Sequence, residues 1–144
     1  MIKHPSNSAE QQACELHIRE AVEGRMGKRF EESHPSVLTG IELDGFINDG
    51  KPILIEIWAH QGEAKGGQRH KLMTDAAKML YCEKLLGKAC RKIIAVSDDS
   101  AVAHLRGRSW QAQFLESFGI EILILPIPED VRDSVMKAQG RQFR

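Results

Sequence analysis

The sequence lacks the cysteine pattern of a disulfide or zinc framework. Its three cysteines, Cys14, Cys82 and Cys90, are an odd number, and none forms a Cys-x-x-Cys pair. The six histidines are scattered, and no two of them stand at zinc-ligand spacing beside a third ligand. We therefore expect reduced, structural cysteines and no zinc site.

Long hydrophobic runs are also missing. No apolar stretch approaches the roughly 20 residues that cross a bilayer. The start of the chain, MIKHPSNSAEQQ, contains no hydrophobic core of a secretion signal. The sequence therefore predicts a soluble, cytoplasmic protein with no membrane partner.

Charge of one sign is not in excess, because 20 Lys and Arg residues balance 20 Asp and Glu residues. The whole-molecule field therefore gives no attraction to nucleic acid, and a phosphate-binding surface has to be a local patch. With 144 residues, 42% of them hydrophobic, and no internal repeat or linker, we expect one domain over residues 1–144.

The spacing of apolar residues predicts alternating helices and strands. Residues 8–26 carry a helical stripe, with Ser8 and Gln11 as a capping box. Segments 38–47 and 51–60 alternate as two strands joined by an Asn-Asp-Gly turn. The expected elements that follow are a helix over 66–88, a strand over 91–99, a helical segment over 100–118, a strand over 120–128 and a helix over 129–139.

An antiparallel hairpin joined to parallel crossover strands predicts an α/β fold, a mixed β-sheet with helices on both faces. The helical segment over 100–118 is expected to break at Gly107, with Ser109 capping its second part. The side chains expected to face inward there, Trp110 as a core anchor among them, are Trp110, Phe114, Leu115 and Phe118.

Two acids stand in strand-like segments that are otherwise rich in Ile, Leu and Phe. Asp44 and Glu56 are symmetric about position 50, inside the expected turn, so they should face each other across the hairpin. Opposed side chains have β-carbons roughly 4.5–5.5 Å apart, and like charges so placed destabilise the pair unless a cation or a shared proton offsets them. Magnesium suits such a site, because it usually takes only one or two protein carboxylates.

A third oxygen donor is expected at Glu42, which an alternating strand would place on the same face as Asp44. The competing interpretation is that Asp44 starts a turn and that Glu56 lies on a solvated face of the sheet. Apolar residues on both sides of Glu56, in the segment ILIEIW, make an exposed face less natural and favour the metal interpretation.

The helix over 66–88 begins with two glycines and carries polar side chains beside its apolar stripe. On a helical wheel these form one margin, which would rim a pocket while the stripe packs on the sheet. The alternative is a solvated edge of ion pairs that contribute only a few tenths of a kcal/mol each. The four residues are Gln68, Lys71, Asp75 and Lys78.

The order of these residues resembles the PD-(D/E)XK nuclease superfamily, over roughly residues 8–125. In that superfamily a helix and a strand with an Asp precede a hairpin to a strand with Glu-x-Lys, and the next helix starts with Gln or Lys. The resemblance implies a restriction-endonuclease-like fold and makes Asp44 and Glu56 ligands of Mg²⁺ or Mn²⁺. The sequence departs from the motif at its lysine, where it has Trp58.

Some members of the superfamily supply the missing cation from the following helix, which makes Lys71 the substitute here, with Lys65 and Lys78 as further candidates. Gln68 matches a glutamine that certain subgroups place at the start of that helix. Many members also bring a Glu from the first helix to the metal, and this favours Glu15, on the buried side of its stripe. The competing interpretation puts Glu15 at the border of the stripe, beside solvent.

The resemblance implies a magnesium-dependent nuclease that hydrolyses phosphodiester bonds in DNA. In it, Asp44 and Glu56 hold the ion, with Glu15 as a third ligand, and Lys71 and Gln68 complete the catalytic set. Contacts with the nucleic acid would come from a local group of cations. The candidates are Lys65, Arg69, His70, Arg106 and Arg108.

Two other functions stay open from the sequence. One is a catalytically inactive module that keeps this fold to bind nucleic acid or a protein, which Trp58 and the zero net charge favour. The other is a small-molecule binding protein whose ligand lies near residues 97–100, where a strand is followed by a helix. The sequence also leaves open whether the chain forms a homo-oligomer.

Overall fold

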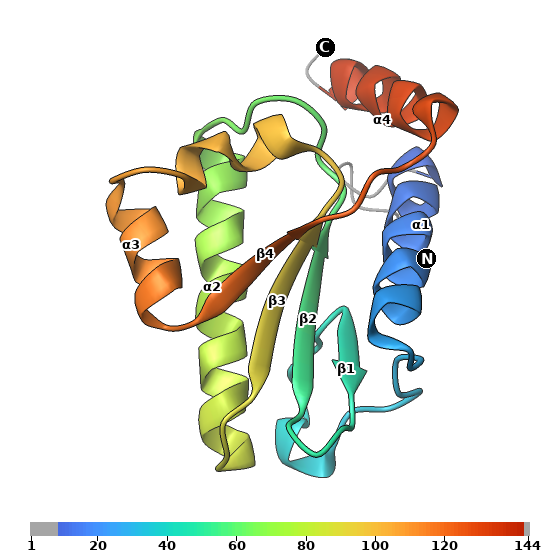
Figure 1. Cartoon of the computed structure of the whole chain (residues 1–144). Coiled ribbons are helices and arrows are strands. Elements are labelled where there is room, and N and C mark those ends of the chain that lie inside the picture. Colours follow the sequence, from blue (N-terminus) through green and yellow to red (C-terminus); the bar gives the residue numbers. More distant parts are fainter. Residues whose placement is uncertain (1–8, 143–144) are drawn as a thin grey trace.

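The computed structural model describes residues 9–142, and within them it contains four strands, four α-helices and two 3-10 helices (Figure 1). Ser8, the expected cap of the first helix, lies outside the described residues. The elements in chain order are α1 (Ala9–Met26), η1 (Ser36–Leu38), β1 (Gly45–Ile47), β2 (Ile53–Trp58), α2 (Gly66–Leu86), β3 (Arg91–Val96), η2 (Asp99–Leu105), α3 (Trp110–Ser117), β4 (Ile120–Ile124) and α4 (Glu129–Gln142).

The strands form one mixed sheet in the order β1-β2-β3-β4. β1 is antiparallel to β2, whereas β2, β3 and β4 run parallel to one another. Helix α2 covers one face of the sheet, and α1 and α4 cover the other (Figure 1). The predicted α/β class with a mixed sheet and helices on both faces is therefore confirmed.

The two faces of β2 carry separate cores, because successive side chains of a strand point to opposite sides. Leu54 and Trp58 pack with the α2 side chains, together with Phe46 of β1. The isoleucines of β2 pack instead with the α1 stripe of Cys14, Ile18 and Val22. Each large aliphatic side chain buried in this way contributes about 1.5–3 kcal/mol. A strand with both faces covered explains why ILIEIW is apolar throughout.

The register of the hairpin agrees with the prediction from the turn. Gly45 pairs with Ile55, and Ile47 pairs with Ile53. One step beyond the last pair, Asp44 and Glu56 are the next two residues in line. The symmetric position of the acids about the turn is thus a feature of the folded chain.

The expected strand over residues 38–47 is wrong in its extent, because only Gly45–Ile47 pair with β2. Residues 36–38 form η1, and its Leu38 is buried on the α2 side. A Cβ on Gly45 would lie 2.4 Å from the ring of Phe30, so this close packing at the start of β1 requires glycine. The chain before Asp44 is therefore committed to packing beside the sheet, and β1 stays short.

The inward prediction for the aromatic residues of the segment over 100–118 is wrong for Trp110 and Phe118, whereas Phe114 is partly buried against the core on the α2 side. Ser109 does cap the helix, since its Oγ accepts a hydrogen bond from Ala112 N–H at 3.1 Å. Of the expected inward side chains only Leu115 is buried, whereas Trp110 is 63% exposed and Phe118 is 50% exposed. α3 is a short helix beside β4 at the edge of the sheet, so little of its surface can reach the core.

All three cysteines are free and buried, in agreement with their expected structural role. Helix α2 ends as its glycine predicted, because Gly87 takes a left-handed conformation with φ at 71°. Among residues 9–142, no helix combines the length and the apolar character needed to cross a lipid bilayer.

Candidate active site

Asp44 stands immediately before β1 and completes the edge of the sheet there. Its Oδ2 accepts a hydrogen bond from the backbone N–H of Ile57 at 2.7 Å. Since β1 begins only at Gly45, this carboxylate bonds a β2 donor beyond the end of the β1 ladder. The bond fixes the direction of the Asp44 side chain before any ligand arrives.

Glu56 is the buried partner of Asp44. It is only 3% exposed, and its carboxyl group hydrogen-bonds that of Asp44. Burial, followed by the charge of Asp44, raises the pKa of Glu56 to about 9. The pKa of Glu56 therefore lies above neutral pH, so at neutral pH its carboxyl group holds a proton beside Asp44.

A lysine of α2 faces Glu56 from above the sheet. Lys78 Nζ lies 2.8 Å from Glu56 Oε1 and 4.0 Å from Asp75 Oδ1. Asp75, expected at a polar margin, is only 8% exposed, and burial raises its pKa. One ammonium group therefore faces two buried carboxyl groups.

Glu15 approaches Asp44 from α1. It lines a cavity of about 220 Å³, which we name the acid pocket. Burial raises the pKa of Glu15, the charge of Asp44 raises it further, and Lys71 opposes the shift. Glu15 is thus close to both Asp44 and Lys71, which its predicted role as a metal ligand from the first helix requires. The lining residues of the acid pocket are Gln12, Glu15, Leu16, Arg19, Asp44 and Ile57.

Trp58 cannot offer a cation to this site. The residue is 4% exposed, belongs to the core on the α2 side, and stacks on His60 with ring centroids 5.2 Å apart. The structure instead brings Lys78 to Glu56 and leaves the exposed Lys71 close enough to influence the pKa values of Glu15 and Asp75. The role of Lys71 in the chemistry stays a prediction.

Gln68 has a structural contact at the start of α2. Its Oε1 accepts a hydrogen bond from the backbone N–H of Lys65 at 2.8 Å. This bond ties the residue that precedes α2 to the first turn of the helix. Gln68 lines a second cavity, of about 230 Å³, beside His60 and Gln139 rather than the acid pocket.

The cations proposed for nucleic acid come from two segments of the chain. Lys65, Arg69 and His70 are at the start of α2, and Arg69 Nε donates to the carbonyl of Ala64 at 3.0 Å. Arg106 and Arg108 lie between η2 and α3. Burial, followed by the charge of Arg69, lowers the pKa of His104 in η2, so the two segments approach each other. Arg106 is paired with Asp99. Neither arginine lines the acid pocket.

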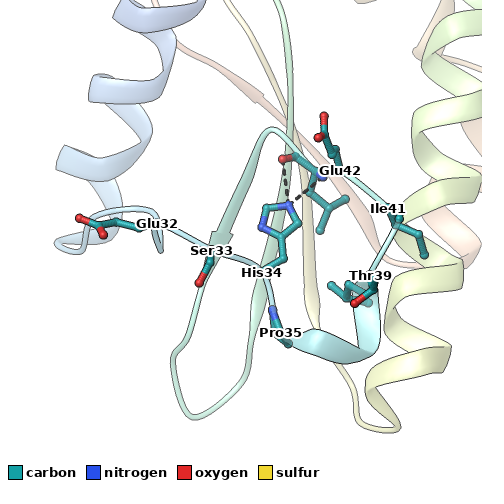
Figure 2. A pocket seen from close by; sticks show the side chains of 10 residues that line it. Glu32, Ser33, His34, Pro35, Thr39, Ile41 and Glu42 are labelled. Atoms are coloured by element: carbon teal, nitrogen blue, oxygen red, sulfur yellow. Dashed lines mark hydrogen bonds between the residues drawn. The ribbon is translucent and has the colours of Figure 1, made fainter.

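The loop before β1 contains a contact that the sequence did not reveal (Figure 2). His34 Nε2 accepts a hydrogen bond from the N–H of Leu43 at 2.9 Å and lies 3.1 Å from its carbonyl oxygen. His34 thereby holds the residue next to Asp44. Glu42, expected as a third ligand, is exposed and lines the cavity drawn in Figure 2 rather than the acid pocket. A lone His in a loop gives no sequence signal for such a role.

The ends of β2 and β3 are filled by their own hydrogen bonds. Asp98 accepts hydrogen bonds from the N–H groups of Gly62 at 2.6 Å and Ser100 at 3.1 Å. The Gln61 amide donates to Ser97 Oγ at 2.6 Å and is 2% exposed. These contacts leave the polar side chains of residues 97–100 little freedom to bind a small molecule.

The residues around Asp44 fit a hard divalent cation by their chemistry. The carboxyl groups of Asp44 and Glu56 offer a cation the oxygen ligands that magnesium prefers, and magnesium keeps several waters of its own. Within residues 9–142, no group of three or more His, Cys, Asp or Glu side chains is close enough to form a metal site by itself. The fit is therefore to a two-carboxylate site, with Glu15 farther along the pocket wall.

Comparison of the chain with protein-family models, curated proteins and solved structures gives no match. The resemblance to the PD-(D/E)XK superfamily accordingly depends on the residues of this chain alone.

Proposed function

We propose that this protein is a magnesium-dependent nuclease that hydrolyses phosphodiester bonds in DNA. The observation that carries the proposal is the meeting of Asp44 and Glu56 at the end of the β1-β2 ladder, where Asp44 also lines the acid pocket together with Glu15. The resemblance of this arrangement to the PD-(D/E)XK superfamily supports the choice of reaction.

Asp44 and Glu56 would hold the ion, with Asp44 aimed by the N–H of Ile57. A bound magnesium ion supplies an activated water and neutralises charge on the phosphate. The proton held by Glu56 would leave when the ion binds, because a carboxylate must be ionised to act as a ligand.

The two lysines of α2 would divide the remaining work. Lys78 is already paired with Glu56 and holds that carboxylate in place. Lys71 is exposed near Glu15, so its ammonium group is able to meet the substrate, hold the water or stabilise the charge that develops on the phosphate.

Cleavage assays test the proposal. Plasmid and linear DNA are incubated with the wild type and with Asp44→Asn and Glu56→Gln, in Mg²⁺ and in Mn²⁺. We expect cleavage by the wild type and a loss of more than about 100-fold in both variants, because each removes a ligand of the ion. Glu20→Gln, an exposed acid on α1, is the matched control and should leave the rate unchanged.

Two results would count against this function. Wild-type protein that binds DNA in Mg²⁺ and Mn²⁺ without cutting it would support the inactive binding module, which the buried Trp58 at the lysine position favours. Cleavage that survives in both variants would place the chemistry outside the acid pocket.

A further inference from the structure

The acid pocket contains a cation that the proposed chemistry does not use. Gln12, Glu15, Leu16 and Arg19 lie on successive turns of α1 and line one wall of the pocket, while Asp44 lines it from the sheet. These four α1 positions flank the buried stripe that packs on the sheet. Arg19 thus stands one helical turn from Glu15, on the same side of α1.

Arg19 is held in place without being neutralised by the acids of the site. Its guanidinium lies over the ring of Phe30, 5.0 Å from the ring centroid. Its Nε is 3.8 Å from Glu23 Oε1, too far for a hydrogen bond, while the other Glu23 oxygen accepts the N–H of Phe30 at 2.8 Å. Phe30 and Glu23 therefore orient the guanidinium and leave its donors available.

The available donors are the unusual feature of this arginine. A guanidinium has five N–H donors in a planar fork that matches the oxygens of a phosphate. In the described part of the chain Arg19 donates none of them in a hydrogen bond, although its side chain is only 46% exposed. An arginine that only shielded the Phe30 ring would have no reason to line a pocket that also holds two carboxyl groups.

A nucleic acid strand that enters the acid pocket needs a cation such as Arg19 on the α1 wall. The protein has no net charge, and the acids of the pocket repel phosphate. Lys71 is on α2, so α1 would otherwise present only acids and neutral side chains to a strand entering the pocket. A fixed guanidinium on the α1 wall gives the backbone a second anchor beside the reacting phosphate.

We infer that Arg19 is a substrate-binding residue, whose guanidinium binds a backbone phosphate next to the phosphodiester that is cut. The inference rests on the proposed function, because the substrate is taken to be a nucleic acid strand that crosses the acid pocket. Arg19 binds the phosphate through its free Nη groups and remains stacked on Phe30. It acts in substrate binding and makes no contact with the reacting atoms.

The experiment compares Arg19→Met with Arg19→Lys. Methionine keeps an aliphatic side chain over Phe30 without the charge, and lysine keeps the charge without the fork. Arg25→Met, an exposed arginine on the same helix, is the matched control. Binding of a fluorescently labelled DNA duplex and of its single strand is measured at several salt concentrations, with Ca²⁺ in place of Mg²⁺. Thermal unfolding and Mn²⁺ affinity are measured on the same samples.

We expect Arg19→Met to weaken DNA binding roughly three- to tenfold and to reduce the salt slope of log Kd by about one, as loss of one phosphate contact requires. Arg19→Lys should retain part of the affinity. In cleavage assays the loss should fall on KM rather than on kcat. Mn²⁺ affinity and thermal unfolding should match the wild type in all three variants.

An Arg19→Met protein with the wild-type affinity and salt slope would overturn the inference while leaving the nuclease proposal standing. Weakened binding in a protein that never cuts DNA would support Arg19 and defeat the nuclease proposal. A wild type that binds neither DNA form at low salt would defeat both.

Discussion

Two buried charge clusters in this molecule differ in their balance. Near the C-terminal end of α2, Lys92 of β3 is 7% exposed and donates to both oxygens of Glu83 at 2.8 Å. Glu83 also accepts the N–H of Cys90, and although burial opposes ionisation, these partners lower the pKa of Glu83 overall. By contrast, where Lys78 of α2 meets β2, burial raises the pKa of Glu56 to about 9.

The difference lies in the number of partners. Glu83 has a lysine and a backbone donor to itself, which is how a structural ion pair is satisfied. Around Glu56, four acids meet only two lysines within reach of their charges; the acids are Glu15, Asp44, Glu56 and Asp75, and the lysines are Lys71 and Lys78. Of these four acids Glu56 and Asp75 are buried, which costs stability, and a cation from outside would relieve that cost.

The largest effect is expected for Lys71→Ala. If Lys71 serves the substrate and Lys78 serves Glu56, this variant should lose cleavage by more than about 100-fold and keep its metal affinity. Steady-state cleavage rates and calorimetric Mn²⁺ titrations measure the two properties. Lys84→Ala, an exposed lysine of the same helix, is the control. Full activity in Lys71→Ala would exclude Lys71 from the role.

The pH dependence of stability should also separate the two clusters. Because the folded-state pKa of Glu56 is raised from 4.5 to about 9, the native protein holds a proton that the unfolded chain releases. The free energy of unfolding of the metal-free protein should therefore fall as pH rises from about 5 to 9, by an amount on the order of 5 kcal/mol.

Urea unfolding in EDTA at several pH values measures this loss. Glu56→Gln, which cannot titrate, should flatten the decline and should be more stable than the wild type at pH 9. The control Glu20→Gln should behave as the wild type does. An identical pH profile in Glu56→Gln would show that Glu56 does not carry the surplus charge.

Breaking the balanced pair should affect stability alone. Lys92→Met leaves Glu83 without its lysine and should reduce the free energy of unfolding by about 2 kcal/mol. Metal affinity should be unchanged, because the Glu83 cluster is separate from the acid pocket. A comparable loss of metal affinity in Lys92→Met would mean that the two clusters are coupled.

The smallest effect is expected from the loop that positions Asp44. His34→Ala removes the bond to the Leu43 N–H, so Asp44 should be held less firmly. We expect metal affinity to fall by about tenfold, as is typical for groups that orient a ligand. Ser33→Ala, an exposed neighbour in the same loop, is the control. Unchanged metal affinity would mean that the hydrogen bond from Ile57 N–H alone orients the Asp44 side chain.

Sequence patterns within one helix or one hairpin were sufficient to predict the features of the fold that such an element determines by itself. The turn fixed the hairpin register, so the position of Asp44 opposite Glu56 followed from simple symmetry. The stripe of α1 at helical spacing placed Cys14, Ile18 and Val22 in the core. The mixed sheet followed from a hairpin joined to crossover strands.

Contacts between distant segments decided the rest. The alternating pattern predicted that the first strand begins at residue 38. In the structure β1 begins only at Gly45, because the His34 contact and the burial of Leu38 hold the preceding residues outside the sheet ladder. The inward prediction for Trp110 assumed a neighbour that the edge position of α3 does not provide. Lys78 reaches Glu56 only because α2 crosses β2 at that point, which no local pattern reveals.

The most direct test is a calorimetric titration of the metal-free protein with Mn²⁺ near neutral pH, in two buffers of different ionisation enthalpy. We expect the wild type to bind one ion for each chain and to release about one proton as Glu56 ionises. We expect no such site in Asp44→Asn or Glu56→Gln. Absence of binding in the wild type, or binding that both variants retain, would contradict this account.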